Sequence, residues 1–237
     1  MIDFKNVSIG HDKTLYQIDD LKLNPSQLYV LIGRNGSGKS TLLSSIVGEI
    51  KPIDGQILIE NHDISTLSKK DKPQKISVVL SNNASIPFLT VREYVSLGRY
   101  PYTSIFGKLS KADEEIIETS IHQVGIERIS NKYTTSISDG ERQLAAIARA
   151  LTQDTPVIIM DEPTAFLDYG NRIKILEILK QLAIAQKKCI LISSHDIDLC
   201  LDFDLPLLLI DEEAKKLIEL EPKTPKSKIL EIGFGIH

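Results

Sequence analysis

The sequence lacks a hydrophobic run that could cross a membrane, because no stretch approaches 18 uninterrupted apolar residues. It also lacks a strong excess of charge: the formal net charge is −4, and no long run of lysine and arginine occurs. This balance argues against nucleic acid as an electrostatically held partner. The first residues show no basic segment followed by an apolar one, as a secretory signal would. We therefore expect an intracellular protein that does not itself cross a membrane.

Cysteine is scarce as well, with 2 in the whole chain. Cys189 lies in an apolar run and Cys200 in a helical pattern, so both are predicted to be buried small apolar residues rather than a disulfide or a metal pair. By contrast, 42% of the 237 residues are hydrophobic and 25% are charged. This composition excludes disorder and fits one large α/β domain, or a domain with a subdomain.

Five short runs are apolar almost throughout, which is typical of strands buried on both faces of a parallel sheet covered by helices. These runs begin at Leu28, Ile76, Val157, Cys189 and Leu205. Other segments alternate better between apolar and polar residues and predict a smaller antiparallel edge sheet. These segments are residues 2–9, 21–23 and 56–60.

Helix signals lie between the central strands. Thr90 and Ser110 each begin a capping pattern, and an apolar stripe on a later segment is predicted to face the core. The stripe consists of Ile173, Leu176, Ile178, Leu179 and Leu182. We therefore expect helices both within the block that follows the second apolar run and between the later strands.

The stretch "GRNGSGKST" follows a buried strand and precedes a helical segment, which is the context that a phosphate-binding loop needs. It comprises Gly33, Arg34, Asn35, Gly36, Ser37, Gly38, Lys39, Ser40 and Thr41. Its glycines would let backbone N–H groups converge on a β-phosphate at a helix N-terminus. Lys39 would reach the β- and γ-phosphates, and the Ser40 hydroxyl would ligate Mg²⁺. The alternative is a merely structural turn.

Polar residues follow two of the apolar runs. Asp161 and Glu162 end "VIIM", and His195 follows "CILISS", so all three are predicted at the edge of the sheet where ligands of open α/β folds bind. Asp161 would hold Mg²⁺ through water, Glu162 would polarise an attacking water, and His195 would lie beside the γ-phosphate. The alternatives are a solvated strand end and a structural histidine.

The stretch "SISDGERQ", residues 136–143, stands at the head of an amphipathic helix and has the spacing of a capping box. An exposed helix N-terminus with Ser138 and Gly140 would also suit a γ-phosphate. Both this helix and the phosphate loop could hardly close on one nucleotide within a compact chain. The pattern therefore predicts a dimer that sandwiches ATP, with a simple capped helix as the alternative.

Together with "TAFLD", which ends at Asp168, these motifs stand in an order that resembles the ATP-binding subunit of an ABC transporter over about residues 1–210. The resemblance implies an ATPase that uses ATP and Mg²⁺. It also implies ATP contacts across the dimer by Ser138, Gly140, Glu141 and Asp168. The implied partners are a second copy and two permease subunits at the cytoplasmic face of the membrane, indirectly a substrate-binding protein, and no nucleic acid.

The stretch "LTVREYVSLGRYPYTSIFGKLSKAD" further resembles ATPases that serve importers of iron-siderophore, haem or vitamin B12 type. The resemblance implies a P-loop NTPase core with a mostly parallel sheet, an N-terminal antiparallel β subdomain and a helical insertion. We expect a single domain whose core spans about 1–82 and 156–210, with the helical subdomain at about 83–155 and a charged tail at 211–237 that runs over the surface.

The sequence departs from the family pattern at several positions. In the Leu-Ser-Gly-Gly-Gln signature, Asp139 replaces the first glycine and is expected to point away from the phosphate, and Glu141 replaces the glutamine. Asn82 stands where the family has a glutamine, so either its shorter side chain ligates Mg²⁺ or a water does. His11 occupies the place of the aromatic residue that stacks on adenine, with Tyr16 as a second candidate and a plain loop histidine as the alternative.

Two other functions remain open at this point. A soluble ABC-type ATPase without a permease would share every nucleotide motif. A P-loop kinase or transferase would explain "GRNGSGKST" but would leave "SISDGERQ" and "TAFLD" without a role. Under the transporter interpretation, we expect a groove for a permease coupling helix between Asn82 and Pro101. The sequence does not name the cargo.

Overall fold

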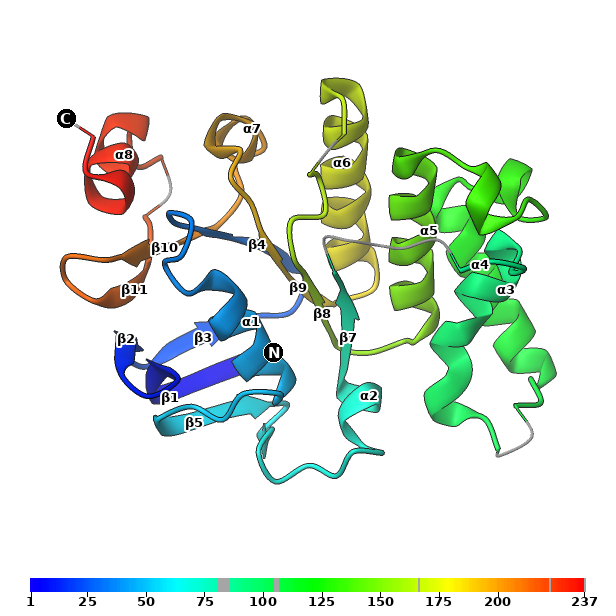
Figure 1. Ribbon diagram of the computed structural model, residues 1–237, viewed down its shortest axis with the longest axis horizontal. Coiled ribbons are helices and arrows are strands. Elements are labelled where there is room, and N and C mark those ends of the chain that lie inside the picture. The colour runs from blue at the N-terminus through cyan, green and yellow to red at the C-terminus, as the bar shows by residue number, and fades with distance from the viewer. Residues whose placement is uncertain (81–85, 105–106, 166, 222, 237) are drawn as a thin grey trace.

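The computed structural model describes residues 1–80, 86–104, 107–165, 167–221 and 223–236, so Asn82 lies outside the described residues. Helices pack around a mixed sheet, which makes an α/β fold (Figure 1). The strands are β1 (Ile2–Gly10), β2 (Thr14–Ile18), β3 (Leu21–Leu23), β4 (Gln27–Ile32), β5 (Asp54–Ile59), β6 (His62–Asp63), β7 (Ile76–Val79), β8 (Val157–Met160), β9 (Cys189–Ser193), β10 (Leu207–Asp211) and β11 (Lys216–Glu219).

The α-helices are α1 (Lys39–Val47), α2 (Lys72–Lys75), α3 (Val91–Ser96), α4 (Lys111–Val124), α5 (Asp139–Thr152), α6 (Tyr169–Ala185), α7 (Ile197–Asp202) and α8 (Lys226–Phe234). Short 3₁₀ helices are η1 (Leu97–Tyr102), η2 (Glu127–Ile129) and η3 (Thr134–Ser136). Between β7 and β8 the described residues form helices and one isolated bridge. Capping boxes at Thr90 and Ser110 start α3 and α4, as predicted.

The sheet is divided into a parallel part and an antiparallel part. Strands β10, β4, β9, β8 and β7 are neighbours in this order and pair in parallel, which confirms the five apolar runs as strands. Strand β1 pairs antiparallel with β2, β3 and β5, which confirms the predicted edge sheet. The carboxyl ends of the parallel strands therefore meet at one edge of the sheet.

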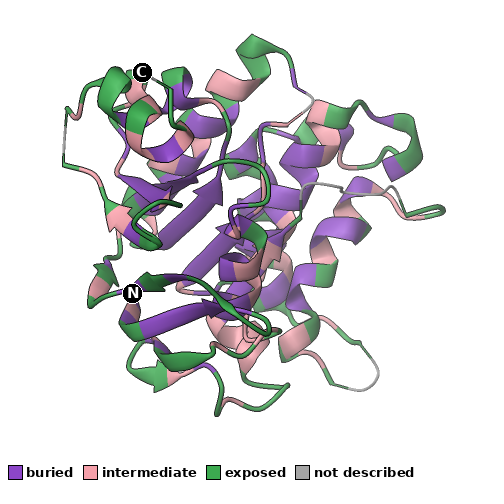
Figure 2. Ribbon diagram, turned by 60° about the vertical axis from the view of Figure 1, so that its left-hand side comes forward, coloured by how far each residue is buried: buried purple, intermediate pink, exposed green. Residues whose placement is uncertain are grey.

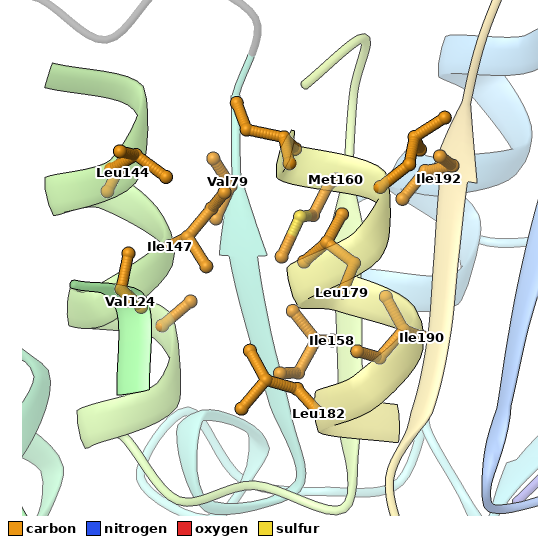
Figure 3. Close-up of a cluster of buried hydrophobic side chains, with 14 of the residues drawn as sticks. Val79, Val124, Leu144, Ile147, Ile158, Met160, Leu179, Leu182, Ile190 and Ile192 are labelled. Carbon is orange, nitrogen blue, oxygen red and sulfur yellow. The ribbon is translucent and has the colours of Figure 1, made fainter. Parts of the chain in front are cut away.

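Residues alternate between the two faces of each central strand, and both faces are buried (Figure 2). Val157 and Ile159 pack with α1 and the edge sheet, whereas Ile158 and Met160 pack with α5 and α6. Figure 3 shows Ile147 of α5 together with Ile158 and Met160 in this second cluster. Burial on both faces explains why the strands show no alternation in the sequence.

The C-terminal segment differs from the predicted surface tail. Strand β11 pairs antiparallel with β10, and α8 packs on β10 with Ile229 fully buried. Leu209 contacts α8 so closely that a Cβ added at Gly233 would lie 2.4 Å from its Cδ1. The prediction was wrong because the charged residues of this segment are interspersed with apolar ones that complete the core, among them Leu217.

Both cysteines are free and buried, as predicted. Burial raises the pKa of the Cys189 thiol to about 12 and that of the Cys200 thiol to about 12. Neither thiol is therefore ionised at neutral pH, and both side chains act as small apolar groups.

Candidate nucleotide-binding site

The phosphate loop lies between β4 and α1. Gly36 and Gly38 have φ angles of 83° and 100°, in the left-handed region that favours glycine. A Cβ added at Gly38 would lie 2.9 Å from Leu15 Cδ1 and 3.0 Å from Tyr16 Cε1. The residues beneath the loop thus leave no room for a side chain, and the backbone turns directly into the N-terminus of α1.

Lys39 is 7% exposed and its ammonium group lies within the curve of the loop. Its Nζ donates to the carbonyl oxygens of Gly33 at 2.8 Å and Arg34 at 3.1 Å. Burial lowers the pKa of Lys39, and the negative charges of Glu162 and Asp161 oppose this shift. The phosphate loop and the two carboxylates are therefore neighbours, as the sequence predicted.

Ser37 shows that the loop suits an anionic ligand. Its side chain is 7% exposed, and Oγ is buried without a hydrogen-bond partner among the described residues. A buried hydroxyl without a partner is costly, so a phosphate oxygen at this position would be stabilising. Ser40 is exposed at the start of α1 and Thr41 is half-buried behind it. Arg34 and Asn35 are exposed at the tip of the loop.

Asp161 and Glu162 follow the end of β8. Ser193, at the end of the neighbouring strand β9, donates from Oγ to Asp161 Oδ1 at 2.6 Å and accepts from the Glu162 N–H at 2.8 Å. Glu162 has a left-handed backbone with φ of 48°, which is uncommon for a residue other than glycine. One buried hydroxyl thus fixes both acidic residues. Sequence reasoning missed Ser193, although a serine that ends a buried strand was a signal.

His195 and Glu162 are brought together by the ends of β9 and β8. His195 Nε2 lies 2.5 Å from Glu162 Oε1, with the side chains 40% and 32% exposed. Both border a cavity of about 570 Å³ that Thr164 and Ser194 also line. The predicted proximity of the histidine to the acidic pair is therefore present, at the edge of the sheet where the parallel strands end.

Ser138 caps α5 in the described structure. Its Oγ accepts from the Glu141 N–H at 3.3 Å, and Glu141 Oε2 accepts from the Ser138 N–H at 2.9 Å, so the capping box is complete. Asp139 is exposed and forms an ion pair with Arg142 at 2.5 Å. Helix α5 lies beyond the β7 edge of the sheet and α1 on the other side of β8 (Figure 1).

Asp168 caps the next helix, α6. Its Oδ1 accepts from the Asn171 N–H at 2.9 Å, and this hydrogen bond lowers the pKa of Asp168. A Cβ added at Gly140 would lie 3.5 Å from Asn171 Nδ2 and 3.7 Å from Leu167 Cδ2. The start of α5 and the segment before α6 are therefore neighbours, although 28 positions separate Gly140 from Asp168 in the sequence.

The two candidates for an adenine contact differ in exposure. His11 is exposed in the turn between β1 and β2. Tyr16 is 1% exposed, and its hydroxyl donates to the Gly38 carbonyl at 3.2 Å. Burial also raises the pKa of Tyr16 above its usual range. Tyr16 was a wrong candidate for stacking because its ring lies in the core, where it supports the phosphate loop from below.

A groove of about 650 Å³ separates the end of α1 and β7 from α5 and η1. Its walls include Val78, Leu97, Tyr100, Pro101 and Arg149, and Tyr100 is 76% exposed. The groove expected between the core and the helical block therefore exists at the segment that ends at Pro101. The predicted contribution of Asn82 lies outside the described residues.

Comparison with known proteins agrees with this geometry. The ABC transporter family profile matches residues 16–165. An uncharacterized ABC transporter ATP-binding protein of Methanocaldococcus jannaschii is 37% identical over 202 residues, which span 85% of this chain and 70% of the relative. The achromobactin transport ATP-binding protein of Dickeya dadantii is 33% identical over 199 residues, which span 84% of this chain and 74% of the relative.

Solved structures are also similar. A dimeric ATP-binding cassette in a post-hydrolysis state with ADP and Pi has a TM-score of 0.75 and 26% identity, and the match covers 95% of this chain and 100% of that one. A chain of an inward-facing ABC transporter, assigned to the metal-chelate type, has a TM-score of 0.82 and 25% identity, with 99% and 88% coverage. Within its described parts, the present chain has no helix that is both long and apolar enough to span a bilayer. The geometry agrees with these similarities, because the phosphate loop lies beside the edge of the sheet that carries Glu162 and His195. The chain is therefore an ATPase and belongs to the ABC transporter family as an ATP-binding subunit.

Proposed function

We propose that this ATPase powers an ABC importer and that its site uses the residues identified above in specific roles. The observation that supports these roles most directly is the pair formed by Glu162 and His195, at 2.5 Å, together with the electrostatic interaction between Glu162 and the buried Lys39 at the start of α1. Hydrolysis of a phosphoanhydride requires a general base, a neighbouring group that orients it and a phosphate-binding cation in one place.

ATP would bind with its phosphates in the loop of residues 33–41. The backbone N–H groups at the start of α1 and the Lys39 ammonium would contact phosphate oxygens, and Ser37 Oγ has an unused hydrogen-bonding capacity there. His11 would contact the adenine. In this arrangement Lys39 exchanges its two carbonyl acceptors for phosphate oxygens of higher charge.

Mg²⁺ would be held by the Ser40 hydroxyl, by Asp161 and by Asn82 or a water. Hydroxyl, carboxylate and amide oxygens are ligands that suit this ion. The ion would supply positive charge against the phosphate oxygens. Ser193 donates to Asp161 Oδ1, and among the described residues no hydrogen bond to Oδ2 is formed, which supports this role.

Glu162 would orient and polarise the attacking water. Its backbone is fixed by Ser193, and its carboxylate is held by His195 Nε2. This close contact with the imidazole restricts the rotamer of Glu162, which supports a fixed position for its carboxylate beside the attacking water. His195 would also lie beside the γ-phosphate, at the entrance of the cavity that both side chains border.

A second copy would complete each site. Ser138, Gly140, Glu141 and Asp168 would contact ATP bound to the partner chain. Ser138, which caps the N-terminus of α5, is exposed, and Gly140 lies beside the segment that leads to Asp168. The solved cassette with ADP and Pi is dimeric, which supports the same arrangement here.

Two permease subunits would hold this dimer at the cytoplasmic face of the membrane, with a substrate-binding protein delivering the cargo. The groove beside Tyr100 would receive a permease helix. The achromobactin relative and the metal-chelate transporter support an iron-siderophore, haem or cobalamin cargo. A soluble ABC-type ATPase without a permease is the alternative, and a kinase or transferase is disfavoured because it leaves α5 without a functional role.

A cross-linking experiment separates these alternatives. Because Cys189 and Cys200 are buried, a cysteine introduced at Tyr100 would be the accessible thiol among the described residues. We expect Tyr100→Cys in native membranes to form a cross-link to a membrane subunit. Ile184→Cys, which is exposed at the far end of α6, is the control and should form none. Cross-links from position 100 only to a second copy of this chain would exclude the importer.

A further inference from the structure

Arg172, in the first turn of α6, joins two segments that border the catalytic edge. Its Nε donates to the Leu167 carbonyl at 2.8 Å, and its Nη1 donates to Asp196 Oδ2 at 3.1 Å. Leu167 directly precedes Asp168, and Asp196 directly follows His195. One guanidinium group therefore holds the residue before the partner-facing aspartate and the residue after the catalytic histidine.

The Asp196 carboxylate is well placed to transmit this restraint. Its Oδ1 accepts from the Leu199 N–H at 3.2 Å and caps α7, while its backbone N–H donates to Ser194 Oγ at 3.1 Å. The backbone on both sides of His195 is thus fixed. Arg172, Asp196 and His195 also line the same cavity, which Glu162 borders.

The geometry is specific to arginine. The guanidinium group is planar and presents its N–H donors in a rigid fork, so it bonds two acceptors in fixed directions at the same time. A lysine at this position could reach one of them as a point charge. With side chains 37% and 27% exposed, the ion pair between Arg172 and Asp196 would contribute little to stability as a surface pair. The fixed orientation of the Arg172 guanidinium group between two acceptors is therefore more informative than the strength of the ion pair.

We propose that Arg172 is a positioning residue for ATP hydrolysis, which couples the segment before Asp168 to the orientation of His195. When a partner chain contacts Asp168, the Leu167 carbonyl and the guanidinium group shift together, and Asp196 transmits the shift to the histidine. This inference rests on the proposed catalytic roles of Glu162 and His195. It adds Arg172 as a residue that does not contact the nucleotide but makes hydrolysis depend on the partner chain.

The test compares steady-state ATP turnover of the purified full chain with Arg172→Ala, Arg172→Lys and a matched control. Lys180 is the control because it also joins α6 to the end of α7, with its Nζ 2.7 Å from the Phe203 carbonyl, at a distance from the nucleotide edge. We expect both Arg172 variants to lower kcat at least roughly tenfold, because displacement of a catalytic group by about 1 Å has effects of this size. The KM for ATP should stay within about twofold.

Further variants keep the outcome interpretable if Arg172→Ala folds poorly. Asp196→Asn retains the helix cap but weakens the contact with Arg172, since asparagine caps as well as aspartate. In a double-mutant cycle, Asp196→Asn should add nothing to the loss of kcat that Arg172→Lys causes. Glu162→Gln tests the proposed function separately, because it should abolish turnover whatever Arg172 does.

Three results would overturn the inference. One is an Arg172→Lys variant with a normal kcat while Glu162→Gln is inactive. Another is a Lys180→Ala variant that loses as much kcat as Arg172→Ala, which would indicate a structural tie between α6 and α7. The third is full additivity of Asp196→Asn and Arg172→Lys. Turnover that survives in Glu162→Gln would instead contradict the proposed catalytic site itself.

Discussion

Lys39 and Glu162 are proposed to have different roles at the nucleotide site. Lys39 lies inside the phosphate loop that follows β4, and Glu162 follows the end of β8, two strands away in the sheet, where Ser193 and His195 hold it. In the proposed mechanism, the lysine would contact phosphate oxygens that are charged both before and during the reaction, whereas the glutamate would face the position from which water attacks. Substitutions at the two positions should therefore have different consequences.

We predict that Glu162→Gln abolishes turnover and preserves ATP binding, because glutamine cannot accept the proton of the attacking water. Lys39→Ala should weaken binding itself, because it removes the cation that holds the phosphates. The measurement is ATP affinity by equilibrium binding, beside turnover, for each variant. An equal loss of affinity in both variants would contradict these separate roles.

At the scale of a single element, the start of α4 is stabilised by the carboxylate of Asp113, which interacts with two other residues. Asp113 completes the capping box with Ser110 and also forms a buried ion pair with Arg99, 2.7 Å from its Nε. The hydrogen bonds from Ser110, together with the pair with Arg99, lower the pKa of Asp113 to about 2. A depressed pKa means that the ionised carboxylate stabilises the folded state.

The stabilisation by Asp113 should consequently depend on pH. It is fully present above the pKa that Asp113 has in the unfolded chain, about 4, and is lost as the pH falls through the folded value of about 2. We expect Asp113→Asn to lower the free energy of unfolding by about 1–2 kcal/mol at neutral pH, with a difference from the parent that shrinks below about pH 4. Urea unfolding at a series of pH values measures it.

A control for this prediction is Glu93→Gln, which alters the exposed capping box of α3 instead. Its carboxylate also accepts a hydrogen bond from the N–H of its cap residue, Thr90, at 2.7 Å, but it forms no ion pair with any residue that the structure describes. We expect Glu93→Gln to lower the free energy of unfolding by less than Asp113→Asn does. If Asp113→Asn is as stable as the parent at neutral pH, the contact with Arg99 does not contribute as described.

At the scale of the whole molecule, the proposed function places two half-sites on separate parts of one chain. The phosphate loop precedes α1 and the Ser138 cap precedes α5, and these helices lie on opposite sides of β8 (Figure 1). A sandwich of two chains would join Lys39 of one to Ser138 of the other. The alternative is that Ser138 serves as a helix cap and nothing more.

We predict that Ser138→Arg in a Glu162→Gln background stays folded but no longer dimerises with ATP, because an arginine side chain would block the interface. Loss of the cap alone would cost about 1 kcal/mol of stability and leave dimerisation intact. Size-exclusion chromatography with ATP, beside thermal unfolding, distinguishes these outcomes. Thr90→Arg removes a similar cap on α3 and should leave dimerisation unchanged.

Mixed dimers extend this experiment. In chains with an intact Glu162, Ser138→Arg and Lys39→Ala should each be inactive alone, and their mixture should regain one site built from Lys39 of the first chain and Ser138 of the second. Normal dimerisation by Ser138→Arg would show that the stretch is only a helix cap and would exclude the two-site mechanism.

Much of the fold and of the site follows from the sequence by itself. The central strands, the caps at Thr90, Ser110 and Ser138, and the glycine-rich loop are set by interactions among residues within a few positions of each other. Because apolar strands such as β8 must be buried on both faces, their composition also predicts the parallel sheet. The ends of parallel strands meet at one edge, so the neighbourhood of Asp161, Glu162 and His195 was predictable too.

Only the tertiary structure decided the contacts that join distant segments. Ser193 bridges Asp161 and Glu162, and Tyr16 lies beneath Gly38, because strand pairing and core packing place them there. Likewise, the C-terminal segment completes the sheet instead of crossing the surface, since its apolar residues find room beside β10. Such contacts depend on which side chains face each other across the fold, and the local spacing of residue types does not encode that.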